Sequence, residues 1–523
     1  MSNERGAAHI PPDTSIDLID GTVGDTLRQM AERFADRPAL VWSGEGGIET
    51  MSYRQLLDEA DRVAAWLLER AAPGDRVGIW SRNSVDWVLL EYGCAKAGMV
   101  VASWNPAWTD HECRHALDLT APALLLADRD TRGVSLMERA RAIVGQERTY
   151  PLANLRKLAS QCSPVPSPPV RPTDLFLIQF TSGTTGRAKG AALSHRAALN
   201  GGWLRTQLAG GDESDVWLNP IPLNHMGGAI SMVLGAMTTG ACYVVMHRFD
   251  PGEYLRMMRE CGATRIGGVP TMILSLAEQP EWRPGSFAVR SIGSGGAQVP
   301  RPLIERLMRE FAAPVIVTYA QSECPLISAT MPNDSAQAIS ETVGRPAPHV
   351  EVRICGLQDG ETLAVGETGE VCVRGPVVME GYYRMPEATA QTIDAEGFLH
   401  TGDLGSIDEN GYLRISGRAR EVIIRGGENI YPAEVEDCLL EHPAVQGAAV
   451  VPIADERWGQ VVGAAVQLRE GFSPGAGELE NHAASRIAHF KVPRRWLFVE
   501  SFPLTPSGKI RKVDVEAMFA DGG

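Results

Sequence analysis

The stretch Leu175–Phe180 (LFLIQF) runs without a break into Thr181–Gly190 (TSGTTGRAKG). The first segment is apolar except for one glutamine and predicts a buried strand. The second contains three glycines, four hydroxyl side chains and two cations. Glycines let the backbone turn its N–H groups toward an anion, and the hydroxyls and cations add donors and positive charge. Together the two segments predict a strand that ends in a phosphate-binding loop.

Two common nucleotide-binding motifs do not fit this loop. In the pattern GxxxxGK[ST] counted from Gly183, the second glycine falls on Ala188. The pattern GxGxxG is not present either. A flexible surface loop rich in glycine and threonine would explain the composition by itself. The apolar strand directly before the loop favours phosphate binding over that alternative.

Outward from this strand, helical and strand patterns alternate through most of the chain. Met51–Arg70 predicts an amphipathic helix in which Ser52 and Gln55 form a capping box. Val85–Ala97 predicts another helix. Short apolar strands are expected at 76–80, 99–103, 124–127, 174–180, 241–246 and 315–318. This alternation indicates an α/β fold with mostly parallel sheets covered by helices.

The chain has 523 residues, which is too long for one compact core. From about residue 350, short alternating strands with glycine turns predict a smaller β-rich subdomain. We therefore expect a large N-terminal domain, 1–417, made of two α/β lobes and the β-rich subdomain. A small α+β C-terminal domain, 418–523, is long enough to fold by itself. The proline-rich segment 161–174 is expected to be an extended linker between two lobes.

The charge of the chain excludes one class of partner. Its formal net charge is −15 and its pI is about 5.3. A nucleic-acid binder needs a basic surface to neutralise phosphates, so we expect no nucleic-acid partner. An anionic substrate must instead meet a local positive site.

Cysteines and apolar stretches indicate a cytoplasmic protein without a membrane span. The nine cysteines are scattered, with no CxxC pair, and are expected to be reduced thiols. The first twenty residues contain no apolar signal region. Met226–Met246 carries no charge and is long enough to span a bilayer. Its Thr-Thr-Gly break at 238–240 predicts instead a buried helix, Ala229–Met237, followed by a strand, Ala241–Met246.

The phosphate loop resembles that of the adenylate-forming (ANL) superfamily, which includes acyl-CoA synthetases, luciferases and the adenylation domains of peptide synthetases. Further stretches resemble the family's other signatures, in the same order: Pro222–Gly228 (PLNHMGG), Gly293–Gln298 (GSGGAQ), Tyr319–Glu323 (YAQSE), His400–Asp403 (HTGD), Gly417-Arg418 and Pro506–Ile510 (PSGKI). The resemblance spans nearly the whole chain. An ordered set of motifs is far more specific than one motif, and the chain is most similar to acid–CoA ligases.

The resemblance implies a reaction in two halves that uses ATP, Mg²⁺ and CoA. A carboxylate attacks the α-phosphorus of ATP and gives an acyl-adenylate and pyrophosphate, and a thiol then displaces AMP. Such chemistry depends on positioning and charge neutralisation. The implied metal ligands are Glu323 and Thr181. The implied nucleotide-binding residues are Thr181, Ser182, Gly183, Thr184, Thr185, Gly186, Lys189, Gly295, Gly296, Ala297, Gln298, Tyr319, Ala320, Gln321, Ser322, Asp403 and Arg418.

Within that set the resemblance implies individual roles. Tyr319 would stack on adenine, and Asp403 would accept both ribose hydroxyls, which suits a two-oxygen acceptor. Arg418 would contact ribose or phosphate; its alternative is a salt bridge to Asp403 or Glu421. Without the family motif, Tyr319 would be interpreted as a core aromatic residue.

The catalytic residues implied are Lys509, His225 and Glu323. Lys509, presented by a turn, would bridge the carboxylate and the α-phosphate as charge develops. His225 would lie where the acyl group meets the pantetheine path and act as a positioned gate. Outside this context, Glu323 and Lys509 would be interpreted as solvated surface residues and His225 as a core histidine.

The sequence departs from the commonest family pattern at four positions. Ala188 stands where proline is usual, Ser322 replaces threonine, and Ala320 replaces glycine near the acyl pocket. Arg420 stands at the hinge, where the family typically has aspartate or lysine. The C-terminal domain of this family is mobile and rotates at this hinge between the two half-reactions. We therefore expect the unusual Arg420 to affect the second half-reaction, thioester formation.

The acyl acceptor and the acid are less specified. Arg425–Pro432 (RGGENIYP) resembles the acyl-CoA synthetase segment, and Phe490–Arg495 (FKVPRR) offers cations for CoA phosphates or is a solvated basic turn. Small residues at the motifs leave room for a bulky apolar acyl group beside Met232. No buried carboxylate for an ammonium is evident, which favours a hydrophobic, non-amino carboxylic acid.

Three other functions compete with an acyl-CoA ligase. A free-standing adenylating enzyme would hand its acyl-adenylate to a carrier protein in trans or to a partner enzyme. A luciferase-like oxygenase uses the same scaffold, but no residue points to it. A non-catalytic nucleotide sensor is disfavoured because Lys509 and Glu323 are intact. A homodimer is compatible with the sequence.

Overall fold

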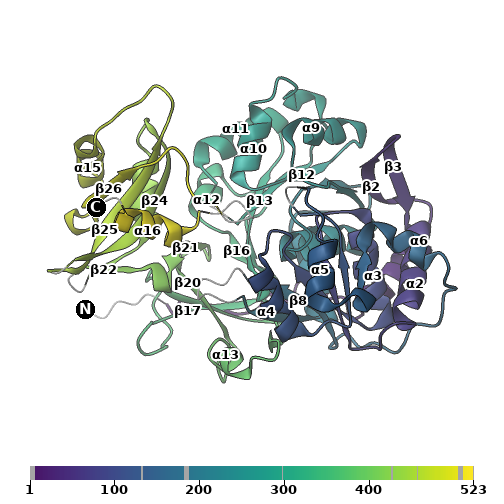
Figure 1. The fold of residues 1–523 in the computed structure, drawn as a ribbon. Coiled ribbons are helices and arrows are strands. Elements are labelled where there is room, and N and C mark those ends of the chain that lie inside the picture. Colours follow the sequence, from purple (N-terminus) through teal and green to yellow (C-terminus); the bar gives the residue numbers. More distant parts are fainter. Residues whose placement is uncertain are drawn as a thin grey trace. The chain divides into compact units, whose positions relative to one another are not determined.

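The computed structural model describes residues 6–130, 133–181, 188–296, 299–425, 428–455, 457–504 and 510–521. The chain forms two compact units. The main unit consists of Ile10–Val352 and Val373–Leu399, and the second unit of Met1–His9, Arg353–Cys372 and His400–Gly523. Figure 1 shows the order of their elements along the chain.

A seven-stranded sheet forms the first lobe of the main unit, in the order β19-β9-β8-β5-β4-β6-β7. Strands β4 to β8 are parallel, and β9 and β19 are added antiparallel at one edge. Helices α4 (Asp110–Thr120) and α5 (Met137–Val144) pack on one face of this sheet. The strands are β4 (Arg76–Trp80), β5 (Val100–Trp104), β6 (Leu124–Ala127), β7 (Thr149–Pro151), β8 (Leu175–Phe180), β9 (Gly190–Ser194) and β19 (Gly381–Tyr382).

A nine-stranded sheet forms the second lobe, in the order β16-β15-β14-β13-β12-β10-β11-β2-β3. Its six inner strands are parallel, and β3, β15 and β16 are antiparallel additions. Helices α9 (Pro251–Glu260), α10 (Pro270–Ala277) and α11 (Arg301–Phe311) pack on one face. The strands are β2 (Pro38–Gly44), β3 (Gly47–Ser52), β10 (Val216–Leu218), β11 (Cys242–Val245), β12 (Arg265–Gly267), β13 (Ser291–Gly295), β14 (Val315–Gln321), β15 (Cys324–Ala329) and β16 (Arg345–Pro346).

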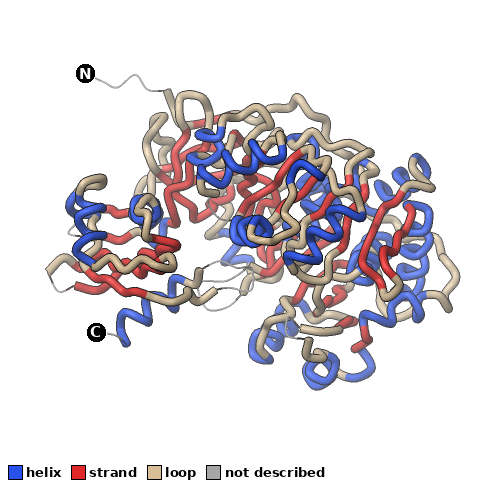
Figure 2. Tube along the Cα trace, turned by 90° about the horizontal axis from the view of Figure 1, so that it is seen from above, coloured by secondary structure: helices blue, strands red, loops and turns tan. Residues whose placement is uncertain are grey.

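These two sheets with their helices confirm the predicted pair of α/β lobes. In Figure 2 the strands of the main unit run between helices. Helix α2 (Tyr53–Leu68) begins with the predicted capping box between Ser52 and Gln55. Because its apolar residues recur on one face, Leu56, Val63 and Leu67 are fully buried. Helix α3 (Val85–Ala97) has the predicted bounds and ends at Gly98 with φ +64°.

The uncharged stretch 226–246 forms a helix and a strand inside the main unit, as predicted, but the helix begins in π geometry. Element η3 (Gly227–Leu234) is a π-helix and continues as α8 (Gly235–Thr239) before β11. A Cβ at Gly228 would lie 2.3 Å from the carbonyl oxygen of Pro222, so only glycine allows this close approach. Among the described residues, no helix is long and apolar enough to cross a membrane.

The second unit is rich in strands. One sheet has the order β1-β17-β18-β20-β21, and the other joins β23, β22, β25 and β24, with β26 beside β25. Helices α14 (Pro432–Leu440) and α15 (Ala476–Ala484) pack on the second sheet, in agreement with the predicted α+β composition. The strands are β1 (His9–Ile10), β17 (Glu351–Cys355), β18 (Gly369–Arg374), β20 (Leu399–Ile407), β21 (Leu413–Arg418), β22 (Ile423–Arg425), β23 (Glu428–Ile430), β24 (Val445–Asp455), β25 (Gly459–Leu468) and β26 (Arg495–Phe498).

The prediction that 161–174 links two lobes is wrong. The segment leads from helix α6 (Leu155–Ala159) to β8, and both β7 and β8 belong to the seven-stranded sheet. It lies against the end of α3, since a Cβ at Gly98 would meet Val170 at 3.2 Å. Prolines favour an extended chain, but composition does not distinguish a free linker from a segment laid on the protein. The predicted boundary at residue 417/418 coincides with the end of β21 and stays a prediction.

A buried ion pair joins two parallel strands of the nine-stranded sheet. Arg265 of β12 lies 2.6 Å from Asp215, which precedes β10, and their side chains are 4% and 0% exposed. Arg290 approaches the same carboxylate to 2.9 Å. The sheet therefore depends on one carboxylate to neutralise a buried guanidinium.

We predict that Asp215→Ala lowers the free energy of unfolding by about 3–5 kcal/mol, because it leaves Arg265 buried without a counter-charge. Urea unfolding followed by circular dichroism measures the effect. Glu305→Ala, which breaks the exposed pair with Arg301 on α11, should cost less than about 1 kcal/mol. If both variants lose the same free energy of unfolding, Asp215 is no more important to stability than an exposed ion-pair partner.

Candidate active site

The two ends of the phosphate loop are joined to each other. Thr181 follows β8 and Lys189 precedes β9, and these strands pair antiparallel. The Thr181 N–H donates to the Lys189 carbonyl at 2.8 Å, and the Lys189 N–H donates to Thr181 Oγ1 at 3.3 Å. The predicted phosphate-binding residues Ser182, Gly183, Thr184, Thr185 and Gly186 lie outside the described residues. Strand pairing thus brings both anchors of the loop to one place.

Tyr382 connects this loop to Glu323. Its hydroxyl donates to Glu323 Oε1 at 2.7 Å, and the Lys189 ammonium lies 4.6 Å from the centre of its ring. The backbone N–H of Met379 donates to the Glu323 carbonyl at 2.8 Å. Lys189 and Glu323, two residues predicted for the site, therefore meet at one buried phenol, and Thr181 is bonded to Lys189. Such a carboxylate and ammonium beside a phosphate loop suit the binding of a metal-complexed polyphosphate.

The predicted adenine-binding segments lie side by side. Strands β13 and β14 are parallel, with Gly295 opposite Thr318. A Cβ at Gly295 would lie 2.7 Å from the Thr318 carbonyl oxygen, so glycine permits this spacing. Gly296 follows with φ +77°, and the half-buried Tyr319, Ala320, Gln321 and Ser322 continue from Thr318. Ala297 and Gln298 lie outside the described residues. Ligands of α/β sheets bind at such carboxyl ends of parallel strands.

His225 is held by a loop that is fixed to β8. Its Nδ1 accepts the Gly227 N–H at 3.1 Å, so in the neutral ring the proton is on Nε2. Gln179, the glutamine of LFLIQF, donates from Nε2 to the Asn224 carbonyl at 2.8 Å. Asn83 accepts the Leu223 N–H at 2.7 Å. The orientation of the imidazole is thus set by neighbouring residues, as a positioned gate requires.

In the second unit, Asp403 and Arg418 form an ion pair. They stand opposite each other on β20 and β21, and Arg418 Nε lies 3.0 Å from Asp403 Oδ1. This is the salt bridge that the sequence left as an alternative for Arg418. Asp403 is 5% exposed. The ion pair neutralises a buried carboxylate that would otherwise be costly.

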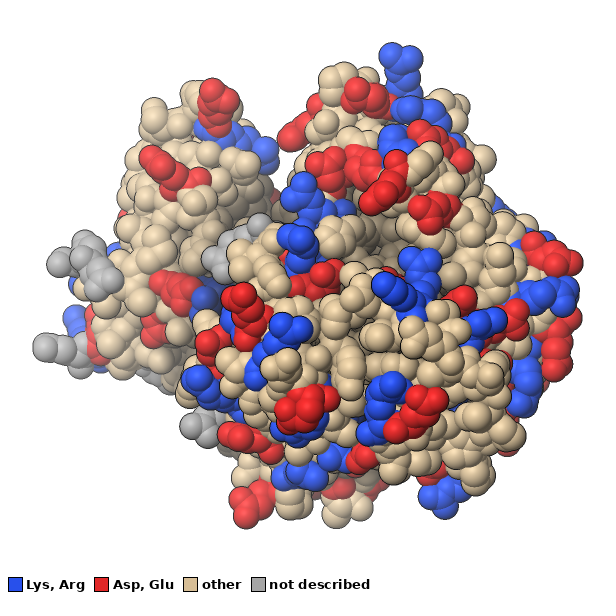
Figure 3. All heavy atoms as spheres, turned by 45° about the vertical axis from the view of Figure 1, so that its right-hand side comes forward, with Lys and Arg blue, Asp and Glu red and all other residues tan. Residues whose placement is uncertain are grey.

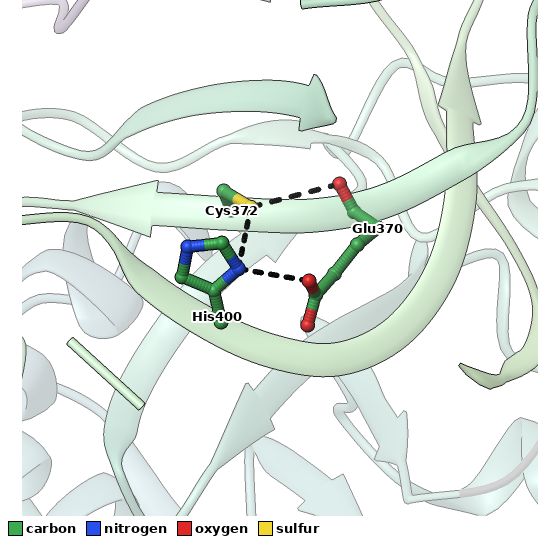
Figure 4. Close-up of side chains that lie close together, drawn as sticks. All are labelled: Glu370, Cys372 and His400. Carbon is green, nitrogen blue, oxygen red and sulfur yellow. Dashed lines mark hydrogen bonds and ion pairs between the residues drawn. The ribbon is translucent and has the colours of Figure 1, made fainter. Parts of the chain in front are cut away.

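Glu370 supports the turn that carries Asp403, and Figure 4 shows its carboxylate beside His400 and Cys372. Its Oε2 lies 2.8 Å from His400 Nδ1, and its Oε1 accepts the Gly402 N–H at 3.0 Å. Thr401 Oγ1 accepts the Asp403 N–H at 3.1 Å. Cys372 brings its sulfur to 3.5 Å from His400 Nδ1, close enough for the three side chains to surround a cation. The hydrogen bonds of Glu370 explain the arrangement without one.

Two of the three cations predicted to meet CoA phosphates form ion pairs with glutamates. Lys491 lies 2.6 Å from Glu434, and Arg494 lies 3.5 Å from Glu480. Arg495 is exposed at the start of β26. The segment is therefore partly a structural ion-pair cluster of the second unit.

Lys509 lies outside the described residues, together with the rest of 505–509. The residues on either side, Leu504 and Ile510, pair as an antiparallel bridge. Helix α16 (Lys512–Asp521) follows, and Lys512 lies 2.7 Å from Glu436.

Charged side chains of both signs alternate on the face drawn in Figure 3. The overall charge is −15. The surface therefore offers no broad positive field on this face, and a bound phosphate group would depend on single cations for its neutralisation.

Sequence reasoning missed Tyr382, Asn83 and Glu370. Each bonds to a residue of a predicted motif from a distant part of the chain, and Tyr382 is 59 positions from Glu323. The sequence did indicate a role for Gln179, because it is the one polar residue in an otherwise apolar strand. In the structure its side chain is 2% exposed.

Comparison with known proteins agrees with this geometry. The family model described as AMP-binding enzyme matches residues 27–383, and that of the AMP-binding enzyme C-terminal domain matches 434–509. The medium-chain acyl-CoA ligase ACSF2, mitochondrial, of Mus musculus is 33% identical over 97% of this chain and 89% of its own length.

Two solved structures are similar over nearly the full length. ATP-bound MatB from Rhodopseudomonas palustris has a TM-score of 0.87 and 27% identity, covering 96% of this chain and 99% of its own. The o-succinylbenzoate CoA synthetase (MenE) from Bacillus subtilis, in complex with its acyl-adenylate intermediate, has a TM-score of 0.83 and 29% identity, covering 95% and 99%.

The chain therefore belongs to the AMP-binding enzymes of the adenylate-forming superfamily, and within them to the AMP-forming acyl-CoA synthetases. The predicted fold, the family and the use of ATP are confirmed. The individual residue roles stay predictions.

We predict that Tyr382→Phe lowers kcat/KM for acid-dependent pyrophosphate exchange at least about 10-fold, because it removes a hydrogen bond to a charged carboxylate. The neighbouring Tyr383→Phe, which keeps the backbone bond to Gly190, serves as the matched control and should stay within about twofold. If both variants behave alike, Tyr382 does not position Glu323.

Proposed function

We propose that this enzyme activates a hydrophobic carboxylic acid with ATP, releases pyrophosphate, and then transfers the acyl group from AMP to the thiol of CoA. The observation that carries the proposal is that Lys189 and Glu323 both contact Tyr382, while Thr181 is bonded to Lys189. A phosphate loop joined to a fixed carboxylate suits attack on a metal-bound triphosphate. The named activity of the mouse relative supports CoA as the acceptor.

In the first half-reaction, an oxygen of the acid bonds to the α-phosphorus of ATP while the bond to pyrophosphate breaks. Thr181 and Lys189 would hold the leaving phosphates, and Lys509 would bridge the acid and the α-phosphate. Glu323 and Thr181 suit Mg²⁺, since both offer hard oxygen atoms and Tyr382 uses only one acceptor position of the carboxylate. Mg²⁺ would supply charge neutralisation there.

In the second half-reaction, the CoA sulfur bonds to the acyl carbon and the bond to AMP breaks. Asp403 would hold the ribose, with Arg418 orienting its carboxylate through the ion pair. The block 418–523 would rotate between the two steps about the segment that contains Arg420. His225 would gate the path of the thiol.

The apolar nature of the acid is supported by the surroundings of His225. The helix that follows it buries Ile230, Met232 and Val233. The name of the mouse relative indicates medium-chain acids for that enzyme. Cytoplasmic location stays a prediction, since that relative is named as mitochondrial.

Pyrophosphate exchange with a panel of acids, followed by AMP release with and without CoA, tests the proposal. We expect exchange with hydrophobic acids and AMP release that depends on CoA. Exchange without thioester formation would favour hand-off of the acyl-adenylate to a carrier protein or partner enzyme. Absence of exchange with every acid would contradict adenylation.

We predict that Lys509→Ala lowers adenylation at least about 100-fold, on the scale of losing one electrostatic donor. The variant should still form thioester from supplied acyl-adenylate and CoA, because Lys509 acts in the first step only. Rapid-quench assays of each half-reaction measure this. Lys157→Ala, at an exposed lysine of α6, is the control; equal loss of both halves in Lys509→Ala would refute the assignment.

A further inference from the structure

Four side chains that commonly bind metals lie on three neighbouring strands of the second unit. Cys355 ends β17, and His400 lies on β20. Strand β18, which runs between these two, carries Glu370 and Cys372. Figure 4 shows Glu370, Cys372 and His400 turned toward one another, and one ligand atom from each lies within 4.8 Å of the others. The hydrogen bonds of the Glu370 carboxylate go to His400 and Gly402, so they explain neither thiol.

Cys355 joins this group from the adjacent strand. Its thiol shares a hydrogen bond with the thiol of Cys372. The two cysteines are 1% and 0% exposed. Two sulfur atoms, an imidazole nitrogen and a carboxylate oxygen are therefore neighbours. Thiolate and imidazole ligands, completed by a carboxylate, are a donor set that suits Zn²⁺.

The spacing of the ligand atoms fits a tetrahedral ion. Cys372 Sγ lies 3.5 Å from His400 Nδ1. Zinc–sulfur and zinc–nitrogen bonds of about 2.3 and 2.0 Å, at a tetrahedral angle, place these two atoms about 3.5 Å apart. His400 Nδ1 and Glu370 Oε2 are 2.8 Å apart, which is a hydrogen-bond distance. A zinc ion would replace that hydrogen bond and widen the spacing to about 3.3 Å, a small movement for a glutamate side chain.

The charges of the group also balance around a divalent ion. Two thiolates and the Glu370 carboxylate carry three negative charges, and the ion neutralises two of them. Arg353, two residues before Cys355 on β17, hydrogen-bonds to the Cys355 side chain and supplies the third positive charge. With a neutral His400, the site sums to zero, which avoids the cost of an uncompensated buried charge.

Burial favours a metal over oxidation of the thiols. Oxidation of a cysteine requires access of an oxidant to the sulfur, and both cysteines are buried. The side chains of His400 and Glu370 are 30% and 18% exposed, so the group is open to solvent on their side. An ion can enter beside the imidazole and the carboxylate.

We propose that this group of four side chains binds one Zn²⁺ ion, in a structural site that is separate from the Mg²⁺ of the proposed reaction. The ion joins β17, β18 and β20 and replaces the two thiol protons. It also holds Glu370, whose other carboxylate oxygen accepts the Gly402 N–H at 3.0 Å. The ion thereby stabilises the turn that carries Asp403. The inference does not depend on the proposed adenylation, because metal binding is measured without turnover.

Zinc binding to the reduced, full-length protein tests this inference, measured by metal analysis after dialysis and by competition with a coloured chelator. We expect about one tightly held Zn²⁺ per chain. Cys355→Ser and Cys372→Ser should each weaken binding at least about 100-fold, since each removes a ligand. Cys438→Ser, which changes a buried cysteine of α14 in the same unit, is the matched control and should bind zinc as the wild type does.

Co²⁺ in place of Zn²⁺ gives a second readout. Wild type and Cys438→Ser should show a sulfur-to-cobalt charge-transfer band, which weakens in the other two cysteine variants. His400→Gln, at a partly exposed side chain, should weaken zinc binding as well and carries the test if those variants do not fold. Absence of zinc binding in the wild type would overturn the inference. Equal affinity in wild type and Cys372→Ser would do the same, as would a disulfide between Cys355 and Cys372 in the isolated protein.

Discussion

The pairing of β8 with β9 is the constraint on which the site depends. Because the two strands run antiparallel, Thr181 and Lys189 bond to each other and hold both ends of the phosphate loop. The ammonium of Lys189 lies over the Tyr382 ring, and the Tyr382 hydroxyl donates a hydrogen bond to Glu323. The two ends of the loop, the Lys189 ammonium and the Glu323 carboxylate are thereby connected before any ligand binds. Phosphoryl chemistry relies on such preorganised charge more than on covalent participation by the protein.

Much of the fold was predictable because it depends on local periodicity. Strands such as Arg76–Trp80 and Leu124–Ala127 are short apolar runs buried on both faces, and the structure has them with the predicted bounds. The π geometry of Gly227–Leu234 was not predictable, since it arises where Gly228 lies against the backbone of Pro222. The segment 161–174 was misassigned because extended proline-rich chain looks the same whether it is free or packed.

The candidate site also contains residues that the sequence predicted and residues that only the structure reveals. Thr181, Lys189 and Glu323 stand in motifs and were predicted from them. Tyr382 and Glu370 act through these residues or through the turn of Asp403, and their partners become visible only when distant strands are brought together.

The central claim is that a carboxylate oxygen attacks the α-phosphorus of ATP. An isotope measurement tests it most directly: the enzyme turns over an acid labelled with ¹⁸O in its carboxylate, in the presence of ATP and CoA, and the products are analysed by mass spectrometry. The account predicts one ¹⁸O atom in AMP and none in pyrophosphate. Label in inorganic phosphate, with ADP as the nucleotide product, would mean attack on the γ-phosphorus and would contradict the account.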